Sequence, residues 1–387
     1  LSRFRREQVV AIHSRASALT VRAGTDAIAH LREYGLRAED VDIVPGAAGG
    51  PKALGINGLD RAVFGDFLPR APRRRTLIGA SIGSWRFAAI AMGQDPALGL
   101  ERLAELYTSQ RFPKGITSRE VSRRCAAMLS ELLQDRDQHI LHNQDYRLVI
   151  VVIRSRGLMA RNGGLGLGLG LAGLIGTNFF SRQATGLFME RGLVYPDGSP
   201  LPVGPLNDFT THHISMRAEN LRAALLASAA IPMVLDGVSE LPGAPDGVYR
   251  DGGMLDYHLD LPYQSAGIVL YPHFTDRVIP GWFDKPLRWR NGDPKRLRRL
   301  LLVSPSREYL ASLPHGKLPD RTDFKHYLGD DAGREAYWRK AVGESQRLGD
   351  EFLELVETGK LVDRIQPLLR GTCYPRQVSL LTRIARD

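Results

Sequence analysis

The sequence predicts an α/β fold with three layers: a mostly parallel central sheet, helices on both of its faces, and a helical C-terminal extension. Two observations lead to this prediction. Short apolar runs typical of buried strands alternate with stretches of helical periodicity, which is the order of strand and crossover helix in a parallel sheet. The 387 residues are 43% hydrophobic and 24% charged, as in average globular proteins, so we expect most of the chain to fold.

The individual elements are predicted from apolar spacing and from the residues that end each run. The first helix is expected over 16–34, because apolar residues recur there at helical spacing and Gly35 follows as a C-cap. Further helices are expected at 84–92, 119–133 and 334–356. Strands are expected at 41–44, 76–78, 148–153, 267–271 and 300–303.

This pattern divides the chain into three parts: an N-terminal helical segment (1–35), a central α/β domain (36–310) and a helical C-terminal extension (311–387). The last part mixes charged and apolar residues at amphipathic spacing. It is either a cap over the domain or a separate helical tail.

The chain is basic, with a formal net charge of +10 that favours contact with polyanions such as an anionic membrane surface. The densest basic clusters, 70–75 and 295–299, lie beside apolar strand-like runs. Because no Lys/Arg run is interleaved with aromatic residues, we expect no nucleic-acid partner.

The two cysteines, Cys125 and Cys373, lie far apart and have neither metal-ligand nor CxxC spacing. This excludes a disulfide framework, leaves a single bridge open, and fits the expectation of no metal and no cofactor. The first six residues carry charge but lack the apolar region and cleavage site of a secretory signal. The expected location is the cytoplasm, with peripheral contact at a membrane.

The segment 79–83 (G-A-S-I-G) fits the pattern G-x-S-x-G, in which a strand turns sharply into a helix and presents a serine at the turn. The predicted strand before it and the predicted helix after it favour Ser81 as a nucleophile. The backbone N–H of Ile82, at the start of the helix, would then face the developing oxyanion. The alternative is an ordinary tight turn in which Gly79 and Gly83 serve only packing.

The glycine-rich segment 46–52 is similar to a phosphate-binding loop but fails that pattern. Pro51 removes an N–H, and Ala53 replaces the hydroxyl that would meet Mg²⁺. Its place before the nucleophile instead favours an oxyanion arm made by the N–H groups of Gly49 and Gly50. Lys52 is either a cationic neighbour of the developing charge or a solvated surface lysine.

A serine hydroxyl is a weak nucleophile and needs a base. Asp251 ends a strand-like run and is followed by two glycines, which leave room for close approach. His258 and His273 also follow Asp251 in the Ser–Asp–His order of α/β-hydrolases, although neither lies in a distinctive motif.

In these features the chain resembles the patatin-like phospholipase family, whose pattern is a G-G-G-x-[RK]-G loop, a G-x-S-x-G elbow and a later D-G-[AG]. The elbow at 79–83 and the D-G-G at 251–253 match in order. The segment 227–232 (A-S-A-A-I-P) matches the A-S-x-A-x-P that family members carry before the aspartate. The resemblance spans residues 41–261.

The glycine-rich loop matches the family less closely than the elbow does. It lies at 48–53, with Gly58 in the family's later glycine position. Ala48 and Ala53 stand at positions that are usually glycine in the family.

The resemblance implies a Ser81–Asp251 dyad without histidine, acting on ester bonds of lipids through an acyl-serine. It implies that the N–H groups of Gly49, Gly50 and Ile82 hold the oxyanion. The expected activity is therefore that of a lipid acyl hydrolase, with a phospholipid or another lipid ester as substrate. An acyltransferase, a general carboxylesterase and a catalytically silent membrane-binding scaffold are the alternatives.

An uncharged tract at 162–181, rich in Leu and Gly, remains outside these motifs. It has nearly the length of a membrane span, but seven glycines weaken both helix formation and apolar transfer, so we do not expect it to cross a bilayer. It is expected to be either a buried or flap segment, or a mobile apolar segment beside the acyl groove. In the second case it would dip into a bilayer with help from Arg154, Arg156 and Arg161.

Overall fold

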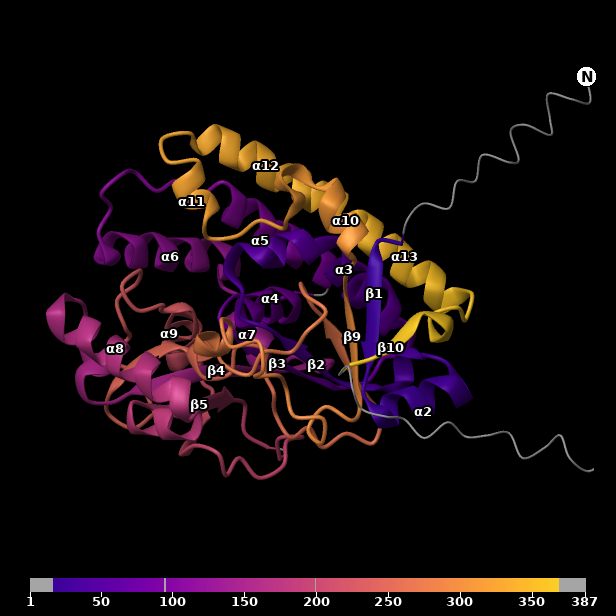
Figure 1. Cartoon of the computed structure of the whole chain (residues 1–387), viewed down its shortest axis with the longest axis horizontal. Helices are drawn as coiled ribbons and strands as arrows, with labels where there is room; N and C mark the ends of the chain where they lie inside the picture. The colour runs from indigo at the N-terminus through magenta and orange to yellow at the C-terminus, as the bar shows by residue number, and fades with distance from the viewer. Residues whose placement is uncertain (1–16, 94, 199, 369–387) are drawn as a thin grey trace, which may run out of the picture.

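The computed structural model describes residues 17–93, 95–198 and 200–368 (Figure 1). Over these residues, ten strands form one mostly parallel sheet flanked by helices, which confirms the predicted α/β fold class. The strands are β1 Leu19–Ala23, β2 Val41–Gly46, β3 Arg75–Ala80, β4 Tyr146–Ser155, β5 Met189–Tyr195, β6 Thr211–Ser215, β7 Val248–Asp251, β8 Ile268–Pro272, β9 Leu300–Pro305 and β10 Ile365–Pro367. The α-helices are α2 Thr25–Tyr34, α3 Asn57–Ala62, α4 Ile82–Ala91, α5 Pro96–Thr108, α6 Ser118–Leu133, α7 Asp137–Leu141, α8 Gly164–Phe180, α9 Ala218–Ala229, α10 Arg307–Ser312, α11 Asp323–His326, α12 Asp331–Glu344 and α13 Gln346–Glu357.

The sheet has a parallel centre and mixed edges. Its strand order is β10-β1-β9-β8-β2-β3-β4-β5-β6, with β7 paired to β4 outside this path. The five strands from β9 to β4 in this order are parallel to one another. Strand β1 pairs with β9 in antiparallel orientation, and both β5 and β7 pair with β4 in antiparallel orientation. Because layers cover both faces, β3 and β9 are buried along their whole length. The carboxyl ends of β2 and β3 meet at one edge, which is where ligands bind in sheets of this kind.

The predicted helix over 16–34 is wrong in its first half. Leu19–Ala23 forms strand β1, and α2 begins only at Thr25. A short apolar run is compatible with the periodicity of a helix and with that of a strand. Here the hydrogen-bonded pairing with β9 and β10 makes the segment a strand. The predicted C-cap is confirmed, since Gly35 has φ 73° and its N–H donates to the carbonyl of Leu31 at 2.9 Å. The predictions for the first six residues and for Cys373 lie outside the described residues.

Although seven glycines weaken helix formation over 162–181, Gly164–Phe180 forms the 17-residue helix α8. Tertiary packing overrides the low helix propensity. Leu167, Gly170 and Leu174 lie on one buried face, and a Cβ on Gly170 would lie 3.1 Å from the Leu158 backbone. No helix in the described part of the chain is both long and apolar enough to cross a bilayer.

The C-terminal segment packs into the body of the protein. The single helix expected over 334–356 is two helices, α12 and α13, which meet at Ser345. The Ser345 hydroxyl accepts the N–H of Gly58 at 2.8 Å, and a Cβ on Gly58 would overlap the Ser345 carbonyl. Figure 1 shows α12 and α13 in gold alongside α5 and α3. Strand β10 then joins the sheet beside β1.

Candidate active site

Ser81 lies at a sharp turn between β3 and α4. Its φ of 56° and ψ of −128° form a backbone conformation that residues other than glycine rarely adopt. Close packing holds this turn. A Cβ on Gly79 would lie 2.5 Å from the Ser84 nitrogen, and one on Gly83 would overlap the carbonyl oxygen of Gly46 at the end of β2. The flanking glycines are therefore required by packing, and that packing supports a strained serine.

The Ser81 hydroxyl donates a 2.7 Å hydrogen bond to Oδ2 of Asp251. Asp251 is the last residue of β7, and its Oδ1 accepts the N–H of Gly253 at 2.7 Å. Both side chains are buried, with 3% and 4% of their residue surface exposed. The fold thus brings together two residues 170 positions apart in the arrangement of a nucleophile and its base.

The environment of Asp251 shifts its acidity in two directions. Burial raises the pKa of its carboxyl, while the Arg321 charge and the hydrogen bonds from Ser81 and Gly253 lower it, and the net shift is upward. An ionised carboxylate with a raised pKa accepts a proton more readily than a free aspartate does.

Ser228 links the turn at Ser81 to strand β4 through two hydrogen bonds. Its hydroxyl accepts the Ser81 N–H at 2.8 Å and donates to the Val151 carbonyl of β4 at 2.7 Å. Ser228 is fully buried near the end of α9. The A-S-A-A-I-P segment therefore fastens the backbone of Ser81 to the sheet.

Part of the predicted oxyanion arm lies beside Ser81. Gly50, Ser81 and Ile82 line the same cavity. Gly50 has φ 57°, a left-handed conformation that favours glycine. The N–H of Ile82 is the first of α4, and the first N–H groups of a helix have no partner within it. These two N–H groups are candidates to hold an oxyanion.

Gly49 and Lys52 lie against Phe274 instead. A Cβ on Gly49 would lie 2.5 Å from a Phe274 ring carbon, and the Lys52 Nζ lies 5.0 Å from the ring centroid. Burial and, after it, the Lys285 charge lower the pKa of Lys52 to about 8. Neither Gly49 nor Lys52 is among the described residues that line the cavity.

The two histidines considered as bases lie elsewhere in the core. His258 and His273 are fully buried, with ring centroids 4.3 Å apart. The Nδ1 of His258 lies 3.1 Å from the Arg277 carbonyl oxygen, and burial lowers the pKa of both imidazoles. Among the described contacts neither ring hydrogen-bonds Ser81, whose hydroxyl is engaged by Asp251.

The cavity beside Ser81 has a volume of about 520 Å³. Its walls come mainly from the loop between α5 and α6, from α6 itself, from the residues after α9, and from the segment around α11, which lie on the same side of the molecule (Figure 1). Most of the lining is apolar, as in sites for small apolar ligands, and Ser81 and Arg321 are among its polar residues. The larger apolar lining residues include Trp85, Phe112, Met128, Ile231, Leu235 and Phe324.

Arg321 is a cavity residue that no sequence motif indicates. It lies in the C-terminal segment just before α11, in the stretch predicted as an extension. A Cβ on Gly50 would lie 3.2 Å from its Nε and 3.7 Å from its Nη2. Only the fold brings this side chain to the glycine loop.

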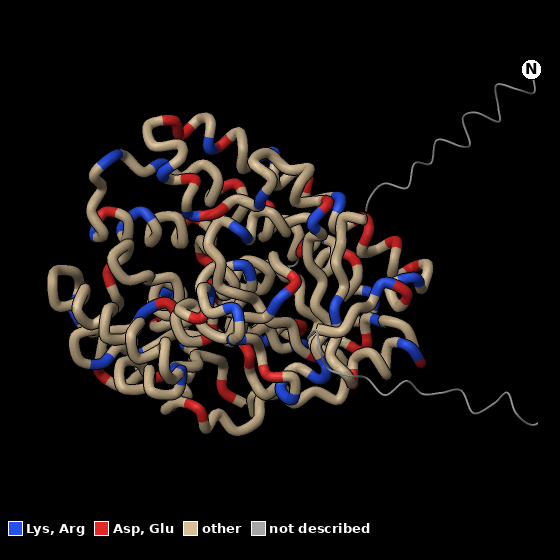
Figure 2. The backbone as a smooth tube through the Cα atoms, in the orientation of Figure 1, with Lys and Arg blue, Asp and Glu red and all other residues tan. Residues whose placement is uncertain are grey.

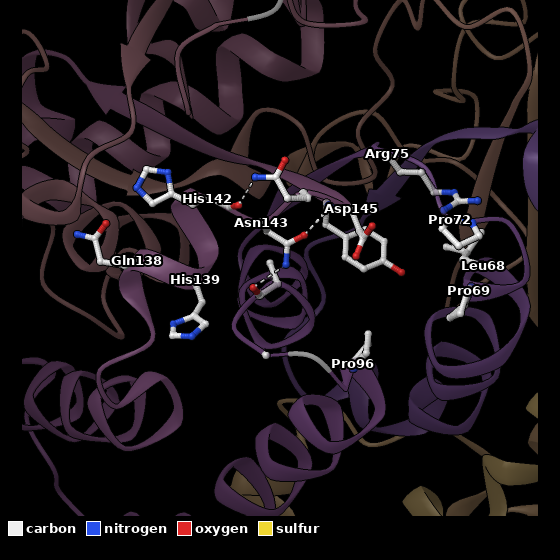
Figure 3. Close-up of a pocket in the computed structure, with 14 residues that line it drawn as sticks. Leu68, Pro69, Pro72, Arg75, Pro96, Gln138, His139, His142, Asn143 and Asp145 are labelled. Atoms are coloured by element: carbon white, nitrogen blue, oxygen red, sulfur yellow. Dashed lines mark hydrogen bonds between the residues drawn. The ribbon is translucent and has the colours of Figure 1, made fainter.

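A second cavity, of about 590 Å³, lies at the opposite edge of the sheet, where β3 and β4 begin (Figure 3). Its polar groups do not converge. Asn143 bonds the Ala91 carbonyl and the N–H groups of Asp145 and Tyr146, while the rings of His139 and His142 stand apart. Among its described lining residues there is no nucleophile paired with a base.

Within the described residues, no three His, Cys, Asp or Glu side chains converge to hold a metal ion. Comparison with known proteins finds no family model that matches this chain and no curated relative that matches it.

Proposed function

We propose that this protein is a serine lipid acyl hydrolase with Ser81 as nucleophile and Asp251 as base. The observation that carries the proposal is the 2.7 Å hydrogen bond from the Ser81 hydroxyl to the buried Asp251 carboxylate, at a strained turn beside an apolar cavity. A serine needs an adjacent base and an oxyanion site for acyl transfer. Asp251 is the candidate base behind Ser81, and the N–H groups of Gly50 and Ile82, which line the cavity with Ser81, are the candidate oxyanion site.

In the proposed reaction, Oγ of Ser81 attacks the ester carbonyl carbon while Asp251 takes the hydroxyl proton. The N–H groups of Gly50 and Ile82 stabilise the oxyanion of the tetrahedral intermediate. The carbon–oxygen bond to the alcohol breaks, and the leaving alkoxide takes the proton from Asp251. Water then attacks the carbonyl carbon of the acyl-serine, and Asp251 accepts a proton from that water. The bond to Oγ of Ser81 breaks, Asp251 returns the proton to Oγ, and the fatty acid departs.

The substrate is inferred from the cavity walls. Apolar and aromatic side chains dominate the lining, which suits a hydrocarbon chain. Trp85 and Met128 lie on this wall, and the Trp85 indole is held by a 2.8 Å hydrogen bond to the Leu225 carbonyl. A phospholipid or another ester with a long acyl chain is the proposed substrate class.

We further propose that the enzyme works at an anionic lipid surface, which helix α8 contacts. The tube over α8 carries no charge (Figure 2). Leu165 is 81% exposed and Phe180 is 85% exposed, while Trp289, 65% exposed, lies beside Phe179. An exposed apolar face of this kind, with basic residues nearby, suits a membrane interface. Arg161 contacts α8, since a Cβ on Gly166 would lie 2.8 Å from its Cδ, whereas Arg156 pairs with Glu190 at 3.3 Å.

The start of α8 lies near the segment after α9 that lines the cavity. The Gly237 N–H donates to Oδ1 of Asn162, two residues before α8, at 2.8 Å. Val234, which lines the cavity, is 44% exposed, and its neighbour Met233 is 59% exposed. We propose that a lipid reaches the cavity from this side, past the exposed side chains of Met233 and Val234.

A fluorophosphonate probe, which reacts with activated serines, tests the proposal. We expect labelling of the wild type, loss of labelling in Ser81→Ala, and retention in Ser312→Ala, which changes an exposed serine on α10. Release of free fatty acid from a phospholipid supports a hydrolase, whereas transfer of the acyl group to an added alcohol indicates an acyltransferase. A folded wild type that is not labelled contradicts the proposal and favours a silent scaffold.

A further inference from the structure

Arg321 lies between the glycine loop and the proposed dyad. Its guanidinium packs over Gly50, where a Cβ would lie 3.2 Å from Nε. Arg321 also lines a small recess together with Asp251, Ile231 and Trp282. The side chain is thus within reach of a group bound beside the reacting ester.

The Arg321 guanidinium hydrogen-bonds no carboxylate among the described residues, although its charge lowers the pKa of the nearby Asp251. Among the described residues it makes no ion pair and no side-chain hydrogen bond. The acids next to it in sequence are used elsewhere, because Asp320 and Asp323 both pair with Lys317, at 2.9 and 2.6 Å. The neighbouring Asp251 accepts the hydroxyl of Ser81 and the N–H of Gly253.

Two further cations raise the positive potential around Arg321. The Lys285 Nζ lies 5.6 Å from the ring centroid of Tyr257, a residue that shares the small recess with Arg321. Partial burial and the Arg321 charge lower the pKa of Lys285. The pKa of Lys52 is lowered by burial first and then by nearby positive charges, Lys285 before Arg321. Three cations that repel one another are stabilised by a bound anion.

We infer that Arg321 binds an anionic group of the substrate, a phosphate or a carboxylate carried a few atoms from the scissile ester, and so selects anionic over neutral acyl esters. This inference rests on the proposed function. Arginine suits the role because its planar guanidinium meets phosphate and carboxylate through two parallel hydrogen bonds. The acyl chain would lie in the apolar cavity, and Arg321 would hold the opposite end of the substrate.

The test compares three esters that share one acyl chain: 1-oleoyl lysophosphatidic acid, 1-oleoylglycerol, and the oleoyl ester of glyceric acid, in which a carboxylate replaces the phosphate arm. Each is presented in the same neutral detergent micelles. We expect the wild type to have a higher kcat/KM for one or both anionic esters than for oleoylglycerol. Preference for one of the two anionic esters shows whether the group bound by Arg321 is a phosphate or a carboxylate.

In Arg321→Gln we expect kcat/KM for the preferred anionic ester to fall on the order of 10- to 100-fold, the range for loss of a charge-assisted pair. The value for oleoylglycerol should change by less than about 3-fold, and Arg321→Lys should restore part of the preference. The matched control is Arg307→Gln, an exposed arginine on α10, which should leave all three values unchanged.

Equal losses on anionic and neutral esters in Arg321→Gln, or an unchanged preference, would overturn the inference. Equal losses would assign Arg321 only the role of keeping Asp251 ionised. Fluorophosphonate labelling of Ser81 distinguishes failure of the anion site at Arg321 from failure of the proposed hydrolase function. Labelling in wild type and in Arg321→Gln, with the preference unchanged, rejects the anion site alone. No labelling and no ester cleavage by the wild type rejects the proposed function and this inference with it.

Discussion

The Ser228 hydroxyl lies 2.8 Å from the backbone nitrogen of Ser81 and accepts its N–H. This contact joins the A-S-A-A-I-P segment to the strained turn that carries the proposed nucleophile. It is a backbone contact, so it fixes where Ser81 lies without taking part in the proposed proton transfer.

Ser228→Ala should lower both stability and activity. It removes the acceptor of the buried Ser81 N–H and the donor to the Val151 carbonyl, which should cost about 1–3 kcal/mol of unfolding free energy. Urea denaturation measures this loss, and ester hydrolysis measures the loss of turn geometry. Ser312→Ala, at an exposed position, should stay within about 0.5 kcal/mol. Full activity and stability in Ser228→Ala would show that the contact is dispensable.

Asp251→Asn should fold but lose activity on the order of 10²- to 10⁴-fold, the contribution of a general base. The amide oxygen can still accept the Gly253 N–H, so the turn after β7 is kept. Circular dichroism checks the fold, and release of fatty acid from a phospholipid checks the activity. If the variant remains fully active, the dyad assignment is wrong and His258 or His273 must be considered again.

The pH dependence follows from the raised pKa of Asp251. Only the ionised carboxylate accepts a proton, so kcat/KM should rise with pH along an acid limb centred above 3.8, the ordinary value for aspartate. Arg321 lowers this pKa, so Arg321→Gln should move the limb to higher pH. A limb at or below the ordinary aspartate value would contradict the burial argument.

The same shift has a consequence for stability with a defined sign. A carboxyl whose pKa is higher in the folded state contributes stability at low pH, and this contribution is lost as pH rises through the folded pKa. Asp251→Asn should therefore be more stable than the wild type at pH 8, and the difference should shrink toward pH 4. Urea denaturation at the two pH values measures it.

Helix α8 offers a test of membrane contact. The double change Leu165→Ser and Phe180→Ser removes two exposed apolar side chains and should lower binding to vesicles that contain anionic lipid by at least about 10-fold. Leu98→Ser, at a 61% exposed position on α5, is the matched control. Leu167 is unsuitable for this test because it is buried. Flotation with vesicles gives the measurement, and unchanged binding would remove α8 from the proposed membrane contact.

Local sequence predicted the parts of the site that depend on backbone geometry. The strand–turn–helix around Ser81 and the D-G-G after β7 are short patterns, and their glycines are required by contacts within a few ångströms. Arg321 could not be predicted, because an arginine before a short helix has no pattern and only the packing of the C-terminal segment brings it to Gly50. The structure of α8 could not be predicted for the same reason, since its buried face depends on distant residues.

The pairing of β10 with β1 places Val21 opposite Ile365 and makes an edge of the sheet from the two far ends of the described chain. Contacts between such distant residues slow folding, because a long loop must close before they form. During synthesis, a nascent chain that already contains Ser81 and Asp251 still lacks Arg321 and the wall around α11. The ribosome therefore makes the proposed catalytic pair before it makes the residues that complete the cavity around it.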